Sequence, residues 1–371
     1  MSKIFKHLNK HHDFINTLTG ALTDTETAYA TVKRIEHLLK TNEAFFKFGN
    51  DGYAKLNYGV DESQYGLHYG KGTYQAGRFT TPSIGELKNS FIPRFPDKIT
   101  TKVLYGSFLY SDIARIIATS SKDTLYQLAS QFNCLESCSP TVVDVAEYFK
   151  DNTQGPRGAI QAFPGALLRH YAAPMIKGTL FPETKRTNQT DANCLNLLDN
   201  VFSDEVAVVQ AGYLQSSNVK YPEALLESLK DGFNQIKIGV HLWIDVPLTK
   251  YKESPHPTVV TNQALVSTIS LGMSEKPIFV SIAKELLKAA YLGTILAASQ
   301  NDLKQIVLTL VGGGAFNNPA PIIWEAMGWA IREAAPYISR ETEIIINTFS
   351  KDKPAADLLD YLPEYEFLHA V

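Results

Sequence analysis

Apolar runs and amphipathic stretches alternate along most of this chain, and their order predicts an α/β protein. Short apolar runs rich in β-branched residues are typical of buried strands, and they lie at 100–108, 124–130, 205–213, 236–246, 258–271 and 305–311. Segments with apolar residues at helical spacing lie between these runs or follow them, at 111–119, 141–150, 159–172, 222–235, 281–299 and 320–336. This alternation predicts a three-layer α/β/α domain with a mixed central sheet.

The beginning of the chain has a different pattern. An amphipathic helix is expected over 27–46, and the following segment 59–77 is rich in glycine and tyrosine. We therefore expect an N-terminal extension, partly helical, over residues 1–75, followed by an α/β domain over residues 76–371.

Composition narrows the class of protein. The chain has 371 residues and 44% hydrophobic content, which is enough for a large core. Its 35 basic and 38 acidic residues are scattered, so a nucleic-acid partner is not expected. Charges throughout the first 18 residues, and the lack of any apolar run of membrane-spanning length, predict no secretory signal of the ordinary kind and no membrane partner. Three cysteines suit a reducing, cytoplasmic compartment.

Two of the apolar runs end in residues that suit a ligand. The run in "LYQLASQFNCLE" (125–136) ends in polar residues, and the run in "IVLTLVGGGAFNNP" (306–319) ends in three glycines and two asparagines. In open α/β sheets, ligands bind outside the carboxyl ends of strands. The N–H groups of Gly312, Gly313 and Gly314 could form a nest for a diphosphate. The loop lacks the Walker and dinucleotide-fold motifs, and a plain tight turn is the alternative.

A second loop, 151–161, leads into a predicted helix. Gln154, Gly155 and Pro156 would place the positive end of that helix near the same ligand, and an ordinary capped turn is the alternative. Asn133, at the end of its strand, would bind a ribose hydroxyl or hold an Asx turn.

Several segments together resemble a known family. The segments "AGRFTTPSIGEL", "ASQFNCLE", "DNTQGPRGAIQAFPGALLRHY", "IKIGVHLWIDV" and "VLTLVGGGAFNNPAPIIWEAMGWAI" resemble, in order and spacing, a divergent macrodomain family that includes the Legionella effector MavL. The resemblance covers about Ala76 to Ile338. It implies a macrodomain fold that binds ADP-ribose and removes it from modified proteins, including ubiquitin modified on arginine. For a secreted effector it implies action in the host cytosol.

The resemblance also implies site residues. Gln154 to Gly158 would form one phosphate loop and Gly312 to Asn318 the other, while Phe316 would pack on a ribose or adenine ring or, alternatively, fill the core. The motif "NAAN" of ordinary macrodomains is replaced by "SQFN", and no Gln-Glu-Glu follows the glycines, so cleavage of poly(ADP-ribose) chains by such a carboxylate pair is not expected. The expected ligand-binding residues are Gln131, Asn133, Gln154, Gly155, Pro156, Gly312, Gly313, Gly314, Ala315, Phe316, Asn317 and Asn318.

Hydrolysis of the glycosidic bond needs a carboxylate that activates water or holds the ribose hydroxyls. Asp245, at the end of the run 236–246, is the first candidate, with a surface aspartate before the Pro247 turn as the alternative. Glu136 is the second candidate, with a solvated loop charge as the alternative.

No metal or other cofactor is expected, because His170 and His256 have no partner at a metal-ligand spacing. Three functions remain open: an ADP-ribosylhydrolase, a non-catalytic reader of ADP-ribosylated proteins, and a different nucleotide-processing enzyme suggested by the glycine loop alone.

Overall fold

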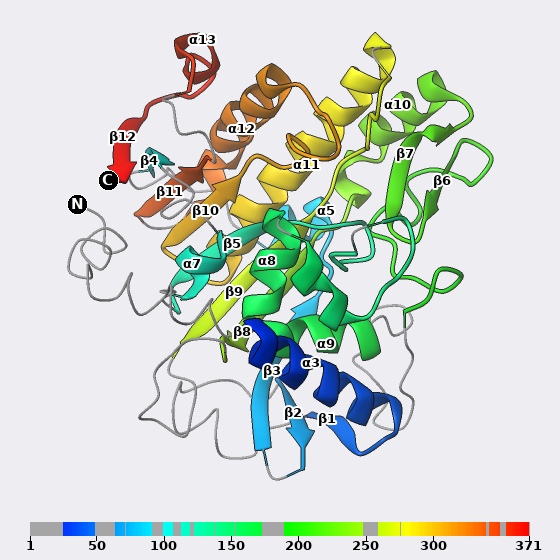
Figure 1. Ribbon diagram of the computed structural model, residues 1–371. Coiled ribbons are helices and arrows are strands. Elements are labelled where there is room, and N and C mark those ends of the chain that lie inside the picture. Colours follow the sequence, from blue (N-terminus) through cyan, green and yellow to red (C-terminus); the bar gives the residue numbers. More distant parts are fainter. Residues whose placement is uncertain are drawn as a thin grey trace.

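The computed structural model joins most of these segments in one mixed sheet (Figure 1). Within the described residues ten strands form this sheet, and a separate hairpin consists of β6 (Ala207–Gln210) and β7 (Tyr213–Val219). The structure describes residues 25–48, 64–70, 72–90, 99–106, 113–118, 122–137, 139–151, 153–172, 189–247, 259–274, 276–338, 341–348 and 354–370. In spatial order, the strands of the sheet are β1 (Ala44–Phe48), β2 (Tyr65–Tyr69), β3 (Gly72–Thr80), β8 (Gly239–Asp245), β9 (Val260–Val266), β5 (Thr124–Ala129), β10 (Gln305–Thr309), β11 (Thr342–Asn347), β4 (Ile99–Gly106) and β12 (Glu366–Ala370).

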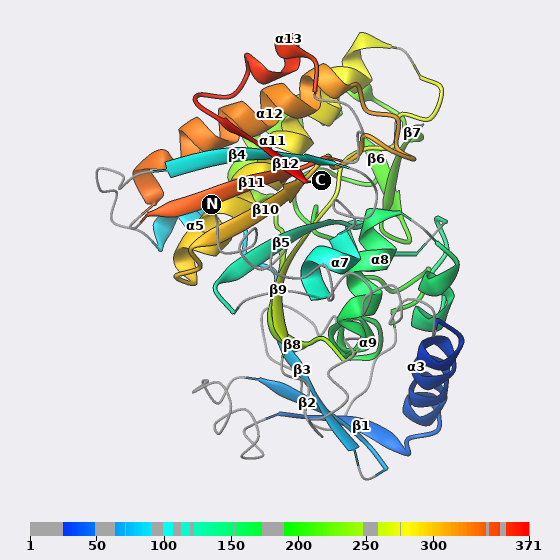
Figure 2. The ribbon, with the colours of Figure 1, turned by 60° about the vertical axis from the view of Figure 1, so that its left-hand side comes forward.

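Helices cover both faces of the sheet, as Figures 1 and 2 show. The helices on one face are α5 (Ile84–Asn89), α10 (Pro222–Asp231), α11 (Pro277–Gln300) and α12 (Ala320–Ala334), and those on the other are α3 (Thr25–Lys40), α7 (Ile113–Ala118), α8 (Gln154–Gln161) and α9 (Phe163–Tyr171). Shorter helical segments are η1 (Val145–Lys150), η2 (Phe233–Gln235), η3 (Ala335–Tyr337) and α13 (Ala356–Leu359). The predicted three-layer arrangement with a mixed sheet is confirmed. None of the described helices combines the length and apolar character needed to cross a membrane.

Strand direction determines which loops can meet. Strands β9, β5, β10, β11, β4 and β12 run parallel, so their carboxyl ends lie at one edge of the sheet. Strand β8 is antiparallel to β9, and its last residue, Asp245, pairs with Val260, the first residue of β9. Asp245 therefore lies at the opposite edge.

The N-terminal segment differs from its prediction. The expected helix 27–46 ends at Lys40, because Asn42 adopts a left-handed conformation with φ 63° and the chain continues into β1. The Gly- and Tyr-rich segment forms β2 and β3. The expected boundary after residue 75 falls inside β3, which is hydrogen-bonded to β8.

Other elements also differ in extent. Helix formation begins at Gln154 rather than Ala159, and a new helix, α9, starts at Phe163 with a proline in its first turn. The expected strand 205–213 is divided by a turn at Ala211 and Gly212, both with positive φ, into β6 and the start of β7. Strands β11 and β12 were not predicted.

Two clusters of buried side chains form the core. The larger cluster lies between the sheet and α11 and α12, and it also includes residues of α7 and of the β6–β7 hairpin. Helix α11 is apolar on most of its surface, as expected of a helix buried on nearly all sides. The smaller cluster joins α3 and β1 to β3 with α8 and α9, so residues before the expected boundary form part of the folded core.

Candidate functional site

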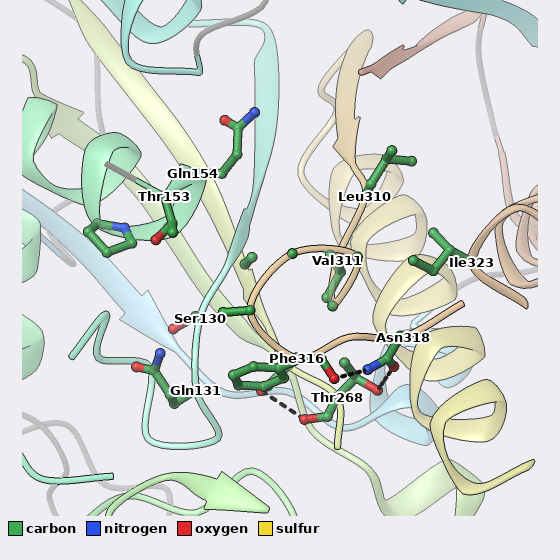
Figure 3. A pocket seen from close by; sticks show the side chains of 18 of the residues that line it. Ser130, Gln131, Thr153, Gln154, Thr268, Leu310, Val311, Phe316, Asn318 and Ile323 are labelled. Atoms are coloured by element: carbon green, nitrogen blue, oxygen red, sulfur yellow. Dashed lines mark hydrogen bonds between the residues drawn. The ribbon is translucent and has the colours of Figure 1, made fainter. Parts of the chain in front are cut away.

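A cavity of about 550 Å³ lies at the edge of the sheet where the parallel strands end (Figure 3). It borders the ends of β5, β9, β10 and β11 and is closed by the first turn of α8 and by the glycine loop. Its volume falls within the range of roughly 300–1,000 Å³ that small-molecule sites occupy. In Figure 3, Thr153 and Gln154 lie on one side of the cavity, and Val311 and Ile323 lie on the other.

The first wall is the N-terminus of α8, which packs directly on the end of β5. A Cβ on Gly155 would lie 1.9 Å from the carbonyl oxygen of Ala129, so only glycine permits this contact. The side chain of the N-cap residue Thr153 makes no capping hydrogen bond, and the first turn of the helix contains no acidic residue. The N–H groups and the positive end of the helix dipole at this position suit an anionic ligand.

The second wall is the glycine loop between β10 and α12. Gly312 has φ +76°, a conformation that side-chain-bearing residues rarely adopt. A Cβ on Gly314 would have no heavy atom within 4 Å, so this backbone borders open space. The loop therefore offers a bare backbone surface to a ligand, at the start of a second helix.

Asn318 holds the glycine loop in shape. It is 4% exposed, its Nδ2 donates to the carbonyl oxygens of Ile269 and Phe316 at 3.0 and 3.1 Å, and Thr268 Oγ1 donates to its Oδ1 at 3.2 Å. Its side chain borders the cavity, but these bonds engage both of its polar atoms. Asn317 does not border the cavity; it occupies a turn with φ 57° and donates to Gly272.

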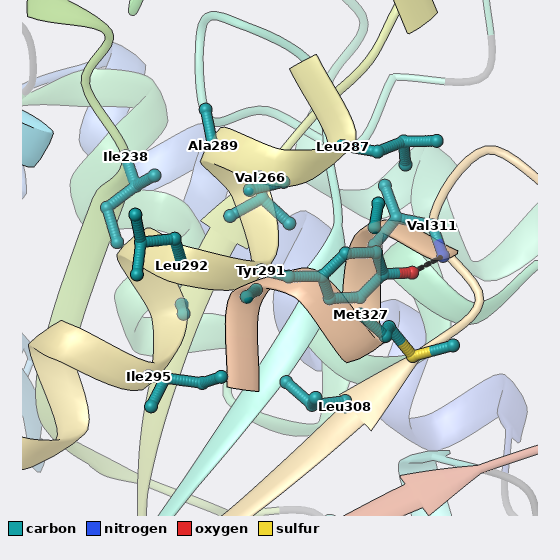
Figure 4. Close-up of a cluster of buried hydrophobic side chains, with 14 of the residues drawn as sticks. Ile238, Val266, Leu287, Ala289, Tyr291, Leu292, Ile295, Leu308, Val311 and Met327 are labelled. Atoms are coloured by element: carbon teal, nitrogen blue, oxygen red, sulfur yellow. Dashed lines mark hydrogen bonds between the residues drawn. The ribbon is translucent and has the colours of Figure 1, made fainter. Parts of the chain in front are cut away.

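A buried tyrosine fixes the point where β10 becomes the glycine loop (Figure 4). The hydroxyl of Tyr291, on α11, donates to the carbonyl oxygen of Thr309 at 2.8 Å and accepts from the N–H of Val311 at 3.1 Å. The core thus holds the loop in place from below.

Gln131 and Phe316 lie close to one another in the cavity, as Figure 3 shows. Phe316 packs on Tyr213 with ring centroids 5.5 Å apart. Gln131 is 7% exposed, its Nε2 donates to the Tyr213 hydroxyl at 3.4 Å, and its Oε1 has no hydrogen-bond partner among the described residues. A buried acceptor of this kind favours a ligand with a hydroxyl or amino donor.

Asp151 is the carboxylate that borders the cavity in the described part of the chain, and no lysine, arginine or histidine does so there. Its Oδ1 accepts the N–H of Thr153 at 2.7 Å, which holds the carboxylate beside the first turn of α8. The cavity therefore combines backbone donors for an anion with one acidic side chain.

Asn133 holds a turn, which was the predicted alternative to a ribose contact. It is fully buried, and its Oδ1 accepts the N–H of Leu135 at 3.0 Å while its Nδ2 donates to the carbonyl oxygen of Ala211 at 2.9 Å. It does not border the cavity, so the expectation of a ribose contact is corrected.

Glu136 lies behind the cavity wall and does not border the cavity. It is fully buried and pairs with Arg169 at 3.2 Å, and Ser130 Oγ donates to its Oε1 at 3.2 Å. Burial raises the pKa of Glu136, and the Arg169 guanidinium opposes this shift. The structure thus shows neither a catalytic position nor a solvated charge but a buried ion pair that supports the end of β5.

Asp245 lies far from the cavity, and the expectation of a catalytic position for it is wrong. It is fully buried, and six residues of β9, about 20 Å, separate its edge of the sheet from the carboxyl end of β9. Its Oδ2 accepts the N–H of Gln75 at 2.6 Å. Burial raises its pKa to about 8, and that hydrogen bond only partly opposes the shift.

The fold brings most of the other expected residues to one cavity, although their binding of a ligand stays a prediction. Ser267, Thr268 and Asn347 also border it and were not predicted. The rule that selected Gln131, a polar residue at the end of a predicted strand, does not find them, because β11 was not predicted and the expected strand 258–271 continues past Ser267 and Thr268. The expected residues that border the cavity are Gln131, Gln154, Gly155, Pro156, Gly312, Gly313, Gly314, Ala315, Phe316 and Asn318.

Comparison with known proteins gives weak similarities. No family model matches the chain, and no curated protein matches it. Among solved structures, poly(ADP-ribose) glycohydrolase from Deinococcus radiodurans in complex with ADP-ribose is 12% identical, with a TM-score of 0.40, and the match covers 76% of this chain and 91% of that chain. The enzyme from Thermomonospora curvata is 9% identical, with a TM-score of 0.39, and the match covers 91% of this chain and 98% of that chain.

At these identities and TM-scores, the similarities carry no argument about this chain. The fold class is established by the strand order and the two helical layers, and the candidate site is defined by its own geometry.

Proposed function

We propose that this chain is an ADP-ribosylhydrolase that binds ADP-ribose in the cavity and hydrolyses the glycosidic bond joining ADP-ribose to a modified protein. The observation that carries the proposal is the pair of bare backbone walls, the first turn of α8 and the glycine loop, on either side of one cavity. Backbone N–H groups and two helix N-termini suit a diphosphate, which carries charge on several oxygens.

The remaining parts of the cavity suit the two ends of ADP-ribose. Leu310, Ile323 and Trp324 give an apolar lining on the side of the glycine loop and α12, which suits an adenine ring. Gln131, with its unpaired acceptor, and Phe316 suit a ribose, whose hydroxyls donate and whose carbon face is apolar. The sequence resemblance to the divergent macrodomain family supports the same ligand.

Asp151 is the candidate for the chemical step. An ionised carboxylate at this position would accept a proton from water as the water oxygen attacks the anomeric carbon of the ribose. The bond from that carbon to the protein's nitrogen or oxygen breaks, and the departing atom takes up a proton. Among the described residues, the hydrogen bond from Thr153 engages Oδ1, and Oδ2 would take this role.

The finer specificity rests on the sequence resemblance. It makes ADP-ribose on an arginine of ubiquitin the first substrate to test and a host cytosolic protein the corresponding partner. No feature of the cavity itself selects ubiquitin.

A non-catalytic reader of ADP-ribosylated proteins is the second candidate. It is favoured by the burial of Asp245 and Glu136 away from the cavity, since a reader needs the cleft and no reactive carboxylate.

Calorimetric titration with ADP-ribose, ADP, ATP and NAD tests which ligand the cavity prefers. We expect ADP-ribose to bind most tightly and to raise the melting temperature most. Tighter binding of ATP or NAD would contradict the proposal and favour the third, general nucleotide enzyme. Binding of ADP-ribose with no release from any modified protein would favour the reader.

A further inference from the structure

Three side chains that can bind a metal converge outside the cavity. Glu36 on α3, Asp144 just before η1 and His170 in the last turn of α9 each present one ligand atom, and these atoms lie within 4.8 Å of one another. The three residues are far apart in sequence. We name this group the Glu36 cluster. The prediction of no metal was based on spacing along the chain, and such spacing does not reveal residues that meet only in the fold.

His170 is the member that needs an explanation. Its side chain is 5% exposed, and its Nδ1 is buried without a hydrogen-bond partner in the described part of the chain. Buried polar atoms are nearly always paired, so an unpaired nitrogen on the imidazole ring of this cluster indicates a missing partner. Burial lowers the pKa of His170 to about 4, so the ring is neutral at pH 7, the form that binds metals.

Glu36 is already held as a metal-binding carboxylate would be. The Tyr171 hydroxyl donates to its Oε1 at 2.7 Å, and the N–H groups of Val145 and Ala146 donate to its two oxygens at 2.7 and 3.1 Å. Hydrogen bonds of this kind orient ligating carboxylates in known sites, and a carboxylate retains further lone pairs for a cation.

Asp144 is the adjustable member of the cluster. Its side chain is about half exposed and forms an ion pair with Lys40, whose Nζ lies 2.6 Å from its Oδ2. An exposed ion pair contributes little stability, so a divalent cation can replace the ammonium group. In a tetrahedral zinc site with bonds of about 2.0–2.2 Å, ligand atoms lie roughly 3.5 Å apart, so zinc would draw the Asp144 carboxylate toward the other two ligands.

We propose that the Glu36 cluster is a zinc site that fastens α3 to α9 and to the segment before η1. One imidazole and two carboxylates are a ligand set that zinc accepts, with water in the fourth position. Two carboxylates balance the charge of Zn²⁺, so the occupied site is neutral as a whole. This inference is independent of the proposed function, because none of the three residues borders the cavity.

The test uses the full chain, purified without an affinity tag and freed of metal by a chelator. Titration with Zn²⁺ should show one site per chain with a dissociation constant of about 1 μM or below, and Zn²⁺ should raise the melting temperature while Mg²⁺ should not. His170→Ala should weaken binding by roughly a hundredfold. His37→Ala, on an exposed histidine of α3 next to Glu36, is the matched control and should bind as wild type does.

The Lys40→Ala variant gives the most specific prediction, a gain in Zn²⁺ affinity. Because Lys40 competes with the cation for Asp144, its removal should tighten Zn²⁺ binding by roughly two- to fivefold. Zinc binding that is unchanged in His170→Ala would place the metal elsewhere and overturn the proposal. No stoichiometric binding to wild type, or weaker binding in Lys40→Ala, would overturn it as well.

Discussion

At the strand ends, side chains that face the cavity alternate closely with side chains that hold its walls. Gln131 faces the cavity, whereas Asn133, two residues later, is turned inward to hold the loop. Phe316 and Asn318 differ in the same way. A strand's alternation of faces does not continue into a loop, so the sequence predicts polar strand ends but not which of their residues face a ligand.

Asp245 and Glu136 show why the catalytic carboxylate could not be chosen from sequence. Asp245 was excluded only by the antiparallel direction of β8, which follows from pairing across the sheet and not from any local signal. The partner that buries Glu136, Arg169, is a residue of α9. Asp151 belongs to the segment 151–161, which was predicted as a turn and a helix start, and a carboxylate there also suits an Asx turn.

Gly314→Ala tests whether a ligand lies against the glycine loop. The added Cβ meets no protein atom within 4 Å, so the melting temperature should not change, whereas ADP-ribose affinity should fall by about tenfold through loss of close backbone approach. Calorimetry and thermal unfolding on the same preparation measure both quantities. Unchanged affinity would mean that the ligand does not touch this loop.

Asp245→Asn tests the buried carboxylate through the pH dependence of stability. Its folded pKa of about 8 exceeds its ordinary value of 3.8, so the folded state holds a proton that the unfolded state releases between these values. Relative to the neutral variant, the wild type should therefore lose stability as pH rises through this range, by up to about 1.4 kcal/mol per pH unit. The melting temperature of Asp245→Asn relative to wild type should rise from pH 5 to pH 8. A constant difference would show that Asp245 titrates at its ordinary pKa.

At the level of elements, the position of α8 defines the first wall of the cavity. Its close approach to β5 depends on Gly155 and Gly158, which meet different neighbours. A Cβ on Gly155 would strike the backbone oxygen of Ala129, whereas one on Gly158 would meet the flexible end of Leu128 at 2.5 Å. The sequence indicated a helix here but placed its start five residues late, because the segment "QGPRG" resembles a turn more than a helix.

This difference gives a matched pair of variants. Gly155→Ala should displace α8 from β5, cost about 2–3 kcal/mol of stability and weaken ADP-ribose binding. Gly158→Ala should cost less than about 1 kcal/mol, because alanine favours the helix and Leu128 can move, and should keep binding. Chemical denaturation and calorimetry compare the two variants. Equal effects in both would show that the contact with Ala129 does not position the wall.

At the level of the whole molecule, the order of strands and helices was readable from hydrophobic pattern over most of the chain. The N-terminal part was not, because its tyrosines and glycines hide the alternation of β2 and β3, and because β1 follows its helix almost directly. These strands extend the sheet, and Val32, Ile35 and Leu67 are buried in the smaller core cluster. The N-terminal part is thus built into the folded core.

Deletion of residues 1–75 should therefore unfold or strongly destabilise the protein, since it removes α3, β1, β2 and part of β3 and exposes the smaller core. Circular dichroism and thermal unfolding of the truncated chain would check this. A truncated chain that unfolds cooperatively and binds ADP-ribose as wild type does would instead show an independent extension that serves only to select the target protein.

The most direct test of the proposed function is release of ADP-ribose from arginine-ADP-ribosylated ubiquitin by wild type and by Asp151→Asn, with ADP-ribose binding measured by calorimetry on the same preparations. We expect release by wild type and a loss of about a hundredfold or more in the variant, with binding kept within a fewfold. Asp245→Asn should retain release. Full release by Asp151→Asn would contradict the role of Asp151, and an absence of ADP-ribose binding by wild type would contradict the proposed function as a whole.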